Sequence, residues 1–282
     1  MKSIINTVVK SKLHKKPIVT DVYFNQNNTK KAVVIFCHGY KGYKDWGAWN
    51  LTAPKFVESN LFFVKFNFSH NGGTVENAID FPDLNAFGEN NFTIELNDLE
   101  DVINWICTNE SFENEIDVKN IILIGHSRGG GIVSIKASEN SKISKVITWS
   151  SVSDFGTRFP TGNLLETWRK DGISYVENSR TKQKMPHYFE FYTNFKENEA
   201  RLTIKNAISK LTIPHLIIHG SNDDVVLPNE AENLHSWNPN SELLLIKDMN
   251  HSLGNIQPWN SKIMPNYLEK VVAKTIEFIL RK

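Results

Sequence analysis

Apolar residues gather along the chain in short unbroken runs that are separated by longer amphipathic stretches. Six runs without apolar–polar alternation lie at residues 32–37, 61–66, 121–124, 146–149, 215–218 and 243–246. Such runs suit strands that are covered on both faces, as strands in a parallel sheet are. Two further β-like runs, at residues 4–9 and 18–24, flank a polar connection and predict an antiparallel hairpin at one edge of the sheet.

Between these runs, apolar residues recur at the three- and four-residue spacing of an amphipathic helix. Leu96, Leu99, Ile103 and Ile106 form one such series, and another extends over residues 268–279. Strands that alternate with helices are typical of an α/β fold with right-handed crossovers. We therefore predict a mostly parallel central sheet of about eight strands with helices on both faces.

Residues 151–210 interrupt this alternation, because one crossover between two strands needs far fewer residues. The aromatic residues that share one face of a predicted helix here are Tyr188, Phe191, Tyr192 and Phe195. Long insertions between strands usually carry function, so we predict an α/β core from residues 1–150 and 211–282 and a helical cap from residues 151–210. The aromatic stripe either packs the cap onto the core or lines a substrate pocket, and both can hold.

The strongest motif follows the run at residues 121–124, which leads directly into Gly125-His126-Ser127-Arg128-Gly129. A helical stretch comes next, so the order is strand, sharp turn and helix, with Ser127 at the apex of the turn. The two glycines, which have no Cβ, let strand and helix approach closely around the serine. The amide of Arg128 at the start of the helix points to where an oxyanion would form. We predict that Ser127 is a nucleophile and that Arg128 supplies an oxyanion-hole amide.

A serine hydroxyl needs a base that takes its proton, and the base needs an acid that holds it. Among nine histidines, His251 is the candidate base because it follows the strand at residues 243–246. The others precede a glycine at a strand end, lie inside the elbow or sit in polar and cap segments. We therefore predict that His251 is the base.

The acid is expected after the strand that ends at Gly220, where Asp223 and Asp224 are adjacent. The distance from the glycine favours Asp223, and Asp224 remains open. Asp154 is a more remote alternative because it follows another strand end. The chain order of serine, acid and histidine is the order that the nucleophile-elbow fold uses.

The oxyanion hole needs a second N–H group. The run at residues 32–37 ends in His38-Gly39, and the amide of Tyr40 is then the natural donor because the glycine lets the loop fold toward the serine. A plain glycine turn would be the better interpretation if this segment stood alone, but the elbow makes that the minor reading.

Together these motifs resemble the α/β-hydrolase superfamily. Within it the chain is similar to bacterial serine esterases and acyl-peptidase-like members of the dienelactone hydrolase, prolyl oligopeptidase and serine aminopeptidase group. The resemblance spans nearly the whole chain and is weakest across the cap. It implies Ser127 as nucleophile, Asp223 as orienting acid, His251 as base, and the amides of Tyr40 and Arg128 as the oxyanion hole.

Two features depart from this group. In many members a proline follows the acid by four residues, whereas Pro228 lies four residues after Asp224 and five after Asp223. Dienelactone hydrolases carry cysteine at the elbow, where this chain has Ser127, so the resemblance does not extend to that chemistry.

The composition of the chain argues against several kinds of partner and cofactor. With 40% hydrophobic and 22% charged residues the chain can form a sizeable core, and a net charge of +1 argues against a nucleic-acid or acidic-membrane partner. Cys37 and Cys107 resemble buried small hydrophobes in a reducing compartment. No signal peptide, membrane span or metal-ligand cluster is recognised in the sequence, so we expect a cytoplasmic monomer or homodimer without cofactor or metal that acts on a small-molecule ester.

The substrate is indicated only by aromatic residues near the predicted site. Trp46 and Trp49 follow the oxyanion loop, and Phe191 and Tyr192 lie in the cap. Such walls favour a small acyl or aromatic ester, cinnamoyl- or feruloyl-type esters among them.

Two other functions stay open. An acyl- or aminopeptidase-like amide hydrolase would need an acidic anchor, which Glu166, Glu177 or Glu190 could supply, although exposed charge on a helix explains them more simply. A non-catalytic binding protein on the same fold is the other, and such proteins commonly lose a triad member.

Overall fold

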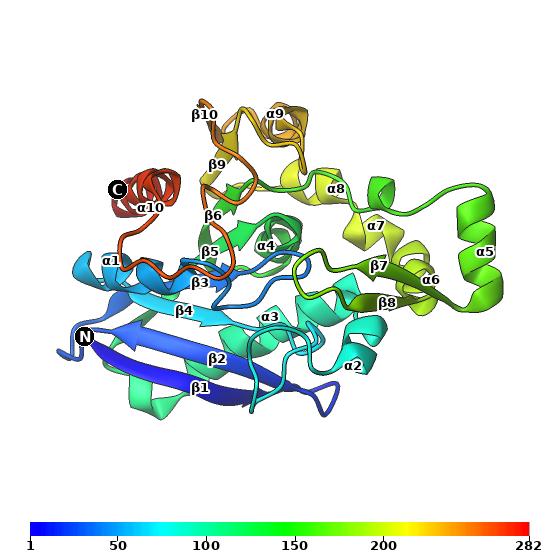
Figure 1. Ribbon diagram of the computed structural model, residues 1–282. Coiled ribbons are helices and arrows are strands. Elements are labelled where there is room, and N and C mark those ends of the chain that lie inside the picture. Colours follow the sequence, from blue (N-terminus) through cyan, green and yellow to red (C-terminus); the bar gives the residue numbers. More distant parts are fainter. Residues whose placement is uncertain (282) are drawn as a thin grey trace.

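A computed structural model describes residues 1–281, and an eight-stranded sheet forms its centre (Figure 1). The strand order is β1-β2-β4-β3-β5-β6-β9-β10. The strands are β1 (Lys2–Lys10), β2 (Pro17–Phe24), β3 (Lys31–Cys37), β4 (Phe62–Phe66), β5 (Ile116–His126), β6 (Ile143–Trp149), β9 (His215–Gly220) and β10 (Glu242–Ile246). Each of the eight predicted runs lies within or overlaps one of them, and the α/β-hydrolase fold class is confirmed.

The predicted hairpin stands at the edge of the sheet. β1 is antiparallel to β2, and β2 is antiparallel to β4, while the remaining neighbours are parallel. Alternate residues of β3 enter different cores: Val33 and Ile35 pack on one face of the sheet, and Val34 and Phe36 on the other. Burial on both faces explains why the central strands read as unbroken apolar runs.

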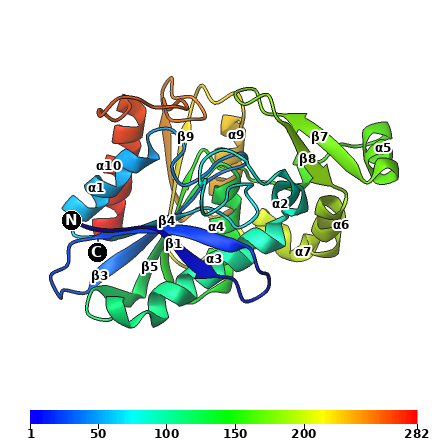
Figure 2. The ribbon, with the colours of Figure 1, turned by 60° about the horizontal axis from the view of Figure 1, so that its bottom comes forward.

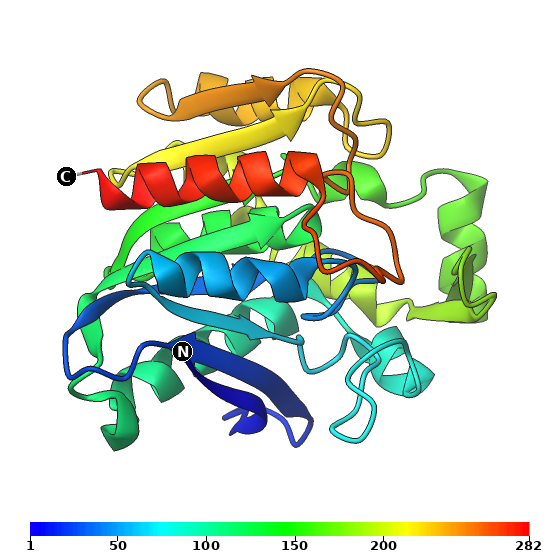
Figure 3. The same ribbon diagram turned by 60° about the vertical axis from the view of Figure 1, so that its left-hand side comes forward.

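Helices form a layer on each side of the sheet. The helices α1 (Thr52–Glu58) and α10 (Asn266–Leu280) contact each other on one face, which Figure 3 brings forward. The opposite layer contains α3 (Phe92–Thr108), α4 (Arg128–Glu139), α8 (Ile204–Ile208) and α9 (Pro228–Trp237). Short 3-10 turns lie at Trp49–Leu51 and Glu110–Phe112. The helical series at 96–106 and 268–279 are confirmed as the buried faces of α3 and α10.

The segment between β6 and β9 projects from one side of the sheet (Figure 1). It contains a 3-10 turn at Gly156–Arg158, α5 (Asn163–Asp171), the hairpin of β7 (Ile173–Glu177) and β8 (Lys184–Tyr188), α6 (Glu190–Glu197), α7 (Glu199–Leu202) and α8. The prediction that Tyr188 shares a helical face with Phe191 is wrong, because Tyr188 ends β8 and the helix begins at Glu190. The two strands of this cap hairpin carry neither an unbroken apolar run nor strict alternation, and Pro186 lies inside β8, so the sequence did not indicate them.

The division into core and cap stays a prediction, with one qualification from the packing. α8 falls inside the predicted cap range 151–210 but packs on α4 in the layer that covers the sheet. It therefore takes the place of the crossover helix between β6 and β9, and the projecting part of the segment ends before it.

A second segment, residues 67–91 between β4 and α3, meets the cap hairpin. It carries α2 (Leu84–Glu89), which contacts β8, and Figure 2 shows the two beside each other. The Tyr188 hydroxyl donates to Asn85 Oδ1 at 2.7 Å, and a Cβ at Gly88 would lie 2.9 Å from the Tyr188 ring. The cap and residues 67–91 therefore pack against each other, and the sequence indicated only the cap.

Within residues 1–281, no helix is both long enough and apolar enough to cross a bilayer. Cys37 is buried, Cys107 is half-buried, and both thiols are free.

Candidate active site

Ser127 occupies a sharp turn between β5 and α4. Its backbone has φ of 55° and ψ of −121°, a conformation that side-chain-bearing residues rarely adopt. The turn is possible because the flanking backbones touch: a Cβ at Gly129 would lie 2.5 Å from the carbonyl oxygen of Cys37. Gly125 is as closely packed, since a Cβ there would overlap the carbonyl of Gly129. The predicted elbow is thus the observed local structure.

Three side chains from three different strand ends converge at this turn. His251, in the loop after β10, lies with Nε2 3.1 Å from Ser127 Oγ. Its Nδ1–H donates to Asp223 Oδ2 at 2.9 Å, and Asp223 lies in the loop after β9. The carboxyl ends of parallel neighbours lie at one edge of a sheet, which is why residues so distant in sequence meet here.

Asp223 is held by its own loop as well as by His251. Its Oδ1 accepts from the amides of Val225 at 3.0 Å and Val226 at 2.8 Å. Burial alone would raise the pKa of Asp223, but hydrogen bonds from His219 and His251 outweigh it and hold that pKa well below its ordinary value. These hydrogen bonds therefore favour the ionised carboxylate.

The alternative acids do not reach the histidine. Asp224 is exposed, and the structure records no hydrogen bond from it to His251 within residues 1–281. Asp154 is exposed and its carboxylate accepts the amide of Gly156 at 2.6 Å. Pro228, which had favoured Asp224 by spacing, opens α9, where a proline at the first turn costs no backbone hydrogen bond.

His126, which the sequence placed in the elbow without a role, supports the base. Its Nε2 lies 2.9 Å from the backbone oxygen of His251, and the two rings are 5.0 Å apart. Burial lowers the pKa of His126 to about 3, so the ring is neutral and can act as a donor at Nε2. Only its position beside Ser127 could have signalled this contact.

The Tyr40 loop lies directly against the elbow. A Cβ at Gly39 would lie 2.9 Å from the Cβ of Ser127, so only glycine permits this approach. Within residues 1–281, the amides of Tyr40 and Arg128 donate to no backbone acceptor outside the regular elements. Two free N–H groups beside a serine are what an oxyanion hole requires.

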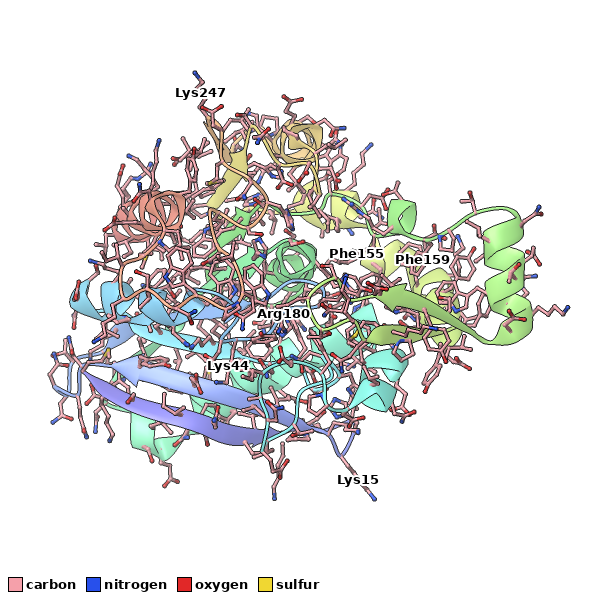
Figure 4. All side chains as sticks on the ribbon, in the orientation of Figure 1. Lys15, Lys44, Phe155, Phe159, Arg180 and Lys247 are labelled. Atoms are coloured by element: carbon pink, nitrogen blue, oxygen red, sulfur yellow. The ribbon has the colours of Figure 1, made fainter. Side chains whose placement is uncertain are left out.

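Two cavities open on Ser127. The larger, of about 690 Å³, lies between the core and the cap, and we call it the cap cavity. Its aromatic lining consists of Tyr40, Phe92, Phe155, Phe159, Trp168, Tyr175, His187 and Phe191. Figure 4 shows Phe155 and Phe159 close together on the side of the core that faces the cap. The hydroxyl of Tyr40 lies 2.7 Å from His187 Nε2, which ties the oxyanion loop to the cap.

The smaller cavity, of about 530 Å³, contains His251 in its wall and is called the His251 cavity. Ser127 and Tyr40 line both cavities, whereas His251 lines only this one. Its wall is more polar: besides Lys41, the polar side chains are Asn178, Ser179, Arg180, Ser252, Asn255 and Gln257. Ser127 therefore lies where the apolar cap cavity meets the more polar His251 cavity.

The four predicted substrate-binding residues lie in three different places. Phe191 lines the cap cavity, and Trp46 and Trp49 line the His251 cavity. Trp49 is buried, with its ring packed on Phe36 and Trp149. Tyr192 lines neither cavity; its ring packs behind the wall on Phe159, Trp168 and Phe189.

Metal ligation has no counterpart in the described part of the chain, where no three His, Cys, Asp or Glu side chains gather as ligands would.

Comparison with known proteins places this geometry among hydrolases. The family described as BD-FAE matches residues 20–238. Monoacylglycerol lipase ABHD6 of Bos taurus is 22% identical over 278 residues, which cover 86% of this chain and 76% of that protein.

Two solved structures illustrate the shared fold. Est1E from Butyrivibrio proteoclasticus, with ferulic acid bound, is 17% identical with a TM-score of 0.69, covering 97% of this chain and 98% of that one. The monoacylglycerol lipase of Paleococcus ferrophilus is 12% identical with a TM-score of 0.66, covering 93% and 98%. At these identities the likeness establishes the fold.

Proposed function

This chain belongs to the BD-FAE family and is an α/β-hydrolase, and from that premise we propose that it cleaves carboxylic esters through an acyl-enzyme on Ser127. His251 is the general base and Asp223 the acid that orients it. The observation that carries the proposal is the continuous hydrogen-bonded line of these three side chains, with contacts of 3.1 and 2.9 Å.

The first half of the reaction begins when Ser127 Oγ attacks the ester carbonyl carbon and His251 Nε2 takes the hydroxyl proton. The carbonyl oxygen becomes an oxyanion that the amides of Tyr40 and Arg128 stabilise. Asp223 stabilises the imidazolium that forms, because it is ionised and accepts from Nδ1. The intermediate collapses as the carbon–oxygen bond to the alcohol breaks and His251 gives its proton to the departing oxygen.

This proton transfer indicates which part of the substrate each cavity would hold. The leaving oxygen must come within hydrogen-bond reach of His251, so the alcohol lies in the His251 cavity. The acyl group then occupies the cap cavity, on the other side of Ser127. In the second half, a water that enters the His251 cavity gives a proton to His251 and attacks the acyl carbon, and the carboxylic acid leaves as Ser127 regains its proton.

The cap cavity supports small acyl or aromatic acyl groups of the cinnamoyl or feruloyl type. A space of about 690 Å³ falls in the range of small-molecule sites, and its aromatic walls suit a planar ring. The binding of ferulic acid by Est1E is consistent with the aromatic alternative.

Amide cleavage at a free amino terminus has less support. Of its candidate anchors, Glu166, Glu177 and Glu190 are exposed, and none lines either cavity. The non-catalytic alternative is disfavoured because all three triad positions are filled and in contact.

The decisive experiment combines labelling with turnover. A fluorophosphonate probe should label the wild type covalently and fail to label Ser127→Ala. The same variant should lose on the order of 10³-fold or more in rate on nitrophenyl esters, because binding and the oxyanion hole alone leave only residual catalysis. Labelling that persists in Ser127→Ala would contradict the assignment. Faster turnover of aminoacyl anilides than of any ester would favour the amide hydrolase.

A further inference from the structure

Charge is distributed unevenly around the nucleophile. Four cationic side chains line the two cavities, and no Asp or Glu of the described residues does so, although the whole chain has nearly equal numbers of both. Arg128 and Arg158 line the cap cavity, and Lys41 and Arg180 line the His251 cavity. The two cavity walls therefore carry cationic side chains and no acidic ones in a nearly neutral protein.

Three of these cations are neutralised from behind the wall. Arg128 pairs with Glu95 at 3.1 Å, Arg158 pairs with Glu230, and Arg180 pairs with Asp80. Figure 4 places Arg180 near the middle of the view, and the β7–β8 turn that carries it reaches back over the core. Each of these ion pairs has a structural function, since it joins segments that enclose the site.

Lys41 differs from the other three. Within residues 1–281, no carboxylate lies within ion-pair distance of its ammonium, and the nearest recorded partner is the Tyr40 ring, 5.4 Å from Nζ. The side chain is half-buried, and burial lowers the pKa of Lys41. A half-buried cation without a counter-ion is unfavourable, and an anion entering the cavity would relieve it.

The backbone and a neighbouring amide add to this picture. Lys41 has φ of 52°, a left-handed conformation that glycine or asparagine would adopt more easily. Asn255 lines the same cavity, and its Nδ2 is buried and has no acceptor among the described residues. Lys41 and Asn255 are thus two residues of the His251 cavity whose donor groups have no acceptor among the described residues.

We propose that Lys41 binds a carboxylate carried by the alcohol part of the substrate, so that the preferred substrates are esters of hydroxy acids. The inference rests on the proposed function, because the reaction at His251 is what places the alcohol in this cavity. Lys41 is then a specificity-determining residue, and the ester bond is cleaved as described above.

Two esters with a common acyl group test this. The cinnamate ester of 4-hydroxybenzoate carries the anion, and the cinnamate ester of 4-hydroxybenzamide has nearly the same shape without it. We expect the wild type to prefer the first in kcat/KM, and Lys41→Met to lower the ratio of the two values by about ten-fold, which is the loss of one charge-assisted contact of about 1.4 kcal/mol. Lys41→Arg should keep most of the preference.

Lys182→Met is the matched control. Lys182 also has a left-handed backbone, with φ of 58°, but it is exposed, pairs with Glu177 and lines neither cavity. Removing the same charge there should leave the ratio unchanged. Equal losses on both esters in Lys41→Met, or an equal fall in the ratio for Lys182→Met, would overturn the proposal.

Binding separates this inference from the catalytic one. In the Ser127→Ala background, titration calorimetry with 4-hydroxybenzoate and 4-hydroxybenzamide should show tighter binding of the acid, and the difference should disappear in the double variant with Lys41→Met. Equal affinity for both would overturn the Lys41 proposal even if esters are cleaved. Absence of cleavage together with selective binding of the acid would instead overturn the proposed function.

Discussion

At the scale of single residues, both carboxylate oxygens of Asp223 have partners. Oδ1 accepts two loop amides and Oδ2 faces His251, with His219 Nε2 3.3 Å away. His219 in turn lies 2.8 Å from the backbone oxygen of Val226, which closes the loop on itself. The acid is therefore fixed before any substrate arrives, and the exposed Asp224 has no comparable setting.

We predict that Asp223→Asn lowers kcat on the order of 10³- to 10⁴-fold, because an amide cannot hold the required imidazole tautomer or stabilise the imidazolium. Asp224→Asn should remain close to wild type, as exposed substitutions usually do. Steady-state kinetics on one nitrophenyl ester measures both, and a larger loss at Asp224 would reverse the assignment.

Sequence alone singled out Ser127 and His251, because the elbow and the strand-end histidine leave strong local patterns. It favoured Asp223 by the glycine spacing but left Asp224 open, because the proline spacing disagreed; the proline has a separate cause, the start of α9. His126 was beyond prediction because its role depends on a backbone oxygen 125 residues away.

At the scale of elements, the cap forms one wall of the cap cavity, and other aromatic side chains of the cap pack on one another behind that wall. α6 presents Phe191 to the cap cavity, where the ring stacks 5.6 Å from His187, while Tyr192, the next residue, packs away from the cavity. The two interpretations left open for the aromatic stripe therefore apply to different residues.

Alanine substitution should separate these two residues. Phe191→Ala should change the ranking of nitrophenyl esters of graded acyl groups by about 1–3 kcal/mol, the range that a hydrophobic pocket can supply. Tyr192→Ala removes a ring of similar size and should lower Tm while leaving the ranking intact. If Phe191→Ala slows every ester by one factor, its ring is packing alone.

The elements that sequence missed share a physical reason. The strands of the cap hairpin show neither an unbroken apolar run nor strict alternation, and the 67–91 segment is mostly irregular, so neither offers a clear periodic pattern. What holds them is long-range: Arg180 pairs with Asp80, and Gln183 donates to the backbone oxygen of Phe81 at 3.0 Å. Such contacts between distant segments leave no mark in a local window.

At the scale of the whole molecule, buried histidines make stability depend on pH. Burial lowers the pKa of five histidines, to about 4 for His38 and His70 and to about 3 for His126, His187 and His215. In the unfolded chain each takes up a proton below about pH 6.5, whereas the folded protein keeps them neutral. Their contribution is therefore complete above pH 6.5 and is lost as the pH falls toward 4.

We expect the free energy of unfolding to fall as the pH is lowered from 6 to 4.5, by up to about 1.4 kcal/mol per pH unit for each of these histidines. Urea unfolding at a series of pH values measures it. His215→Gln should remove one such contribution from the slope, while His235→Gln, at a half-buried ring on α9 that only adds to the lowering of the His215 pKa, should change the slope far less. A flat profile from pH 7 to 5 would show that these rings are protonated in the folded state.

The packing of the cap hairpin on residues 67–91 has a consequence for protein engineering. Three contacts join residues 67–91 to the cap hairpin. They are the hydrogen bond from Tyr188 to Asn85, the ion pair of Arg180 with Asp80, and the close packing of Gly88 against the Tyr188 ring. A chimera that imports only the hairpin-bearing insertion from another hydrolase would leave Asp80 without its arginine and Gly88 facing a foreign side chain. Transplanting substrate preference therefore calls for a two-piece graft, in which both segments travel together.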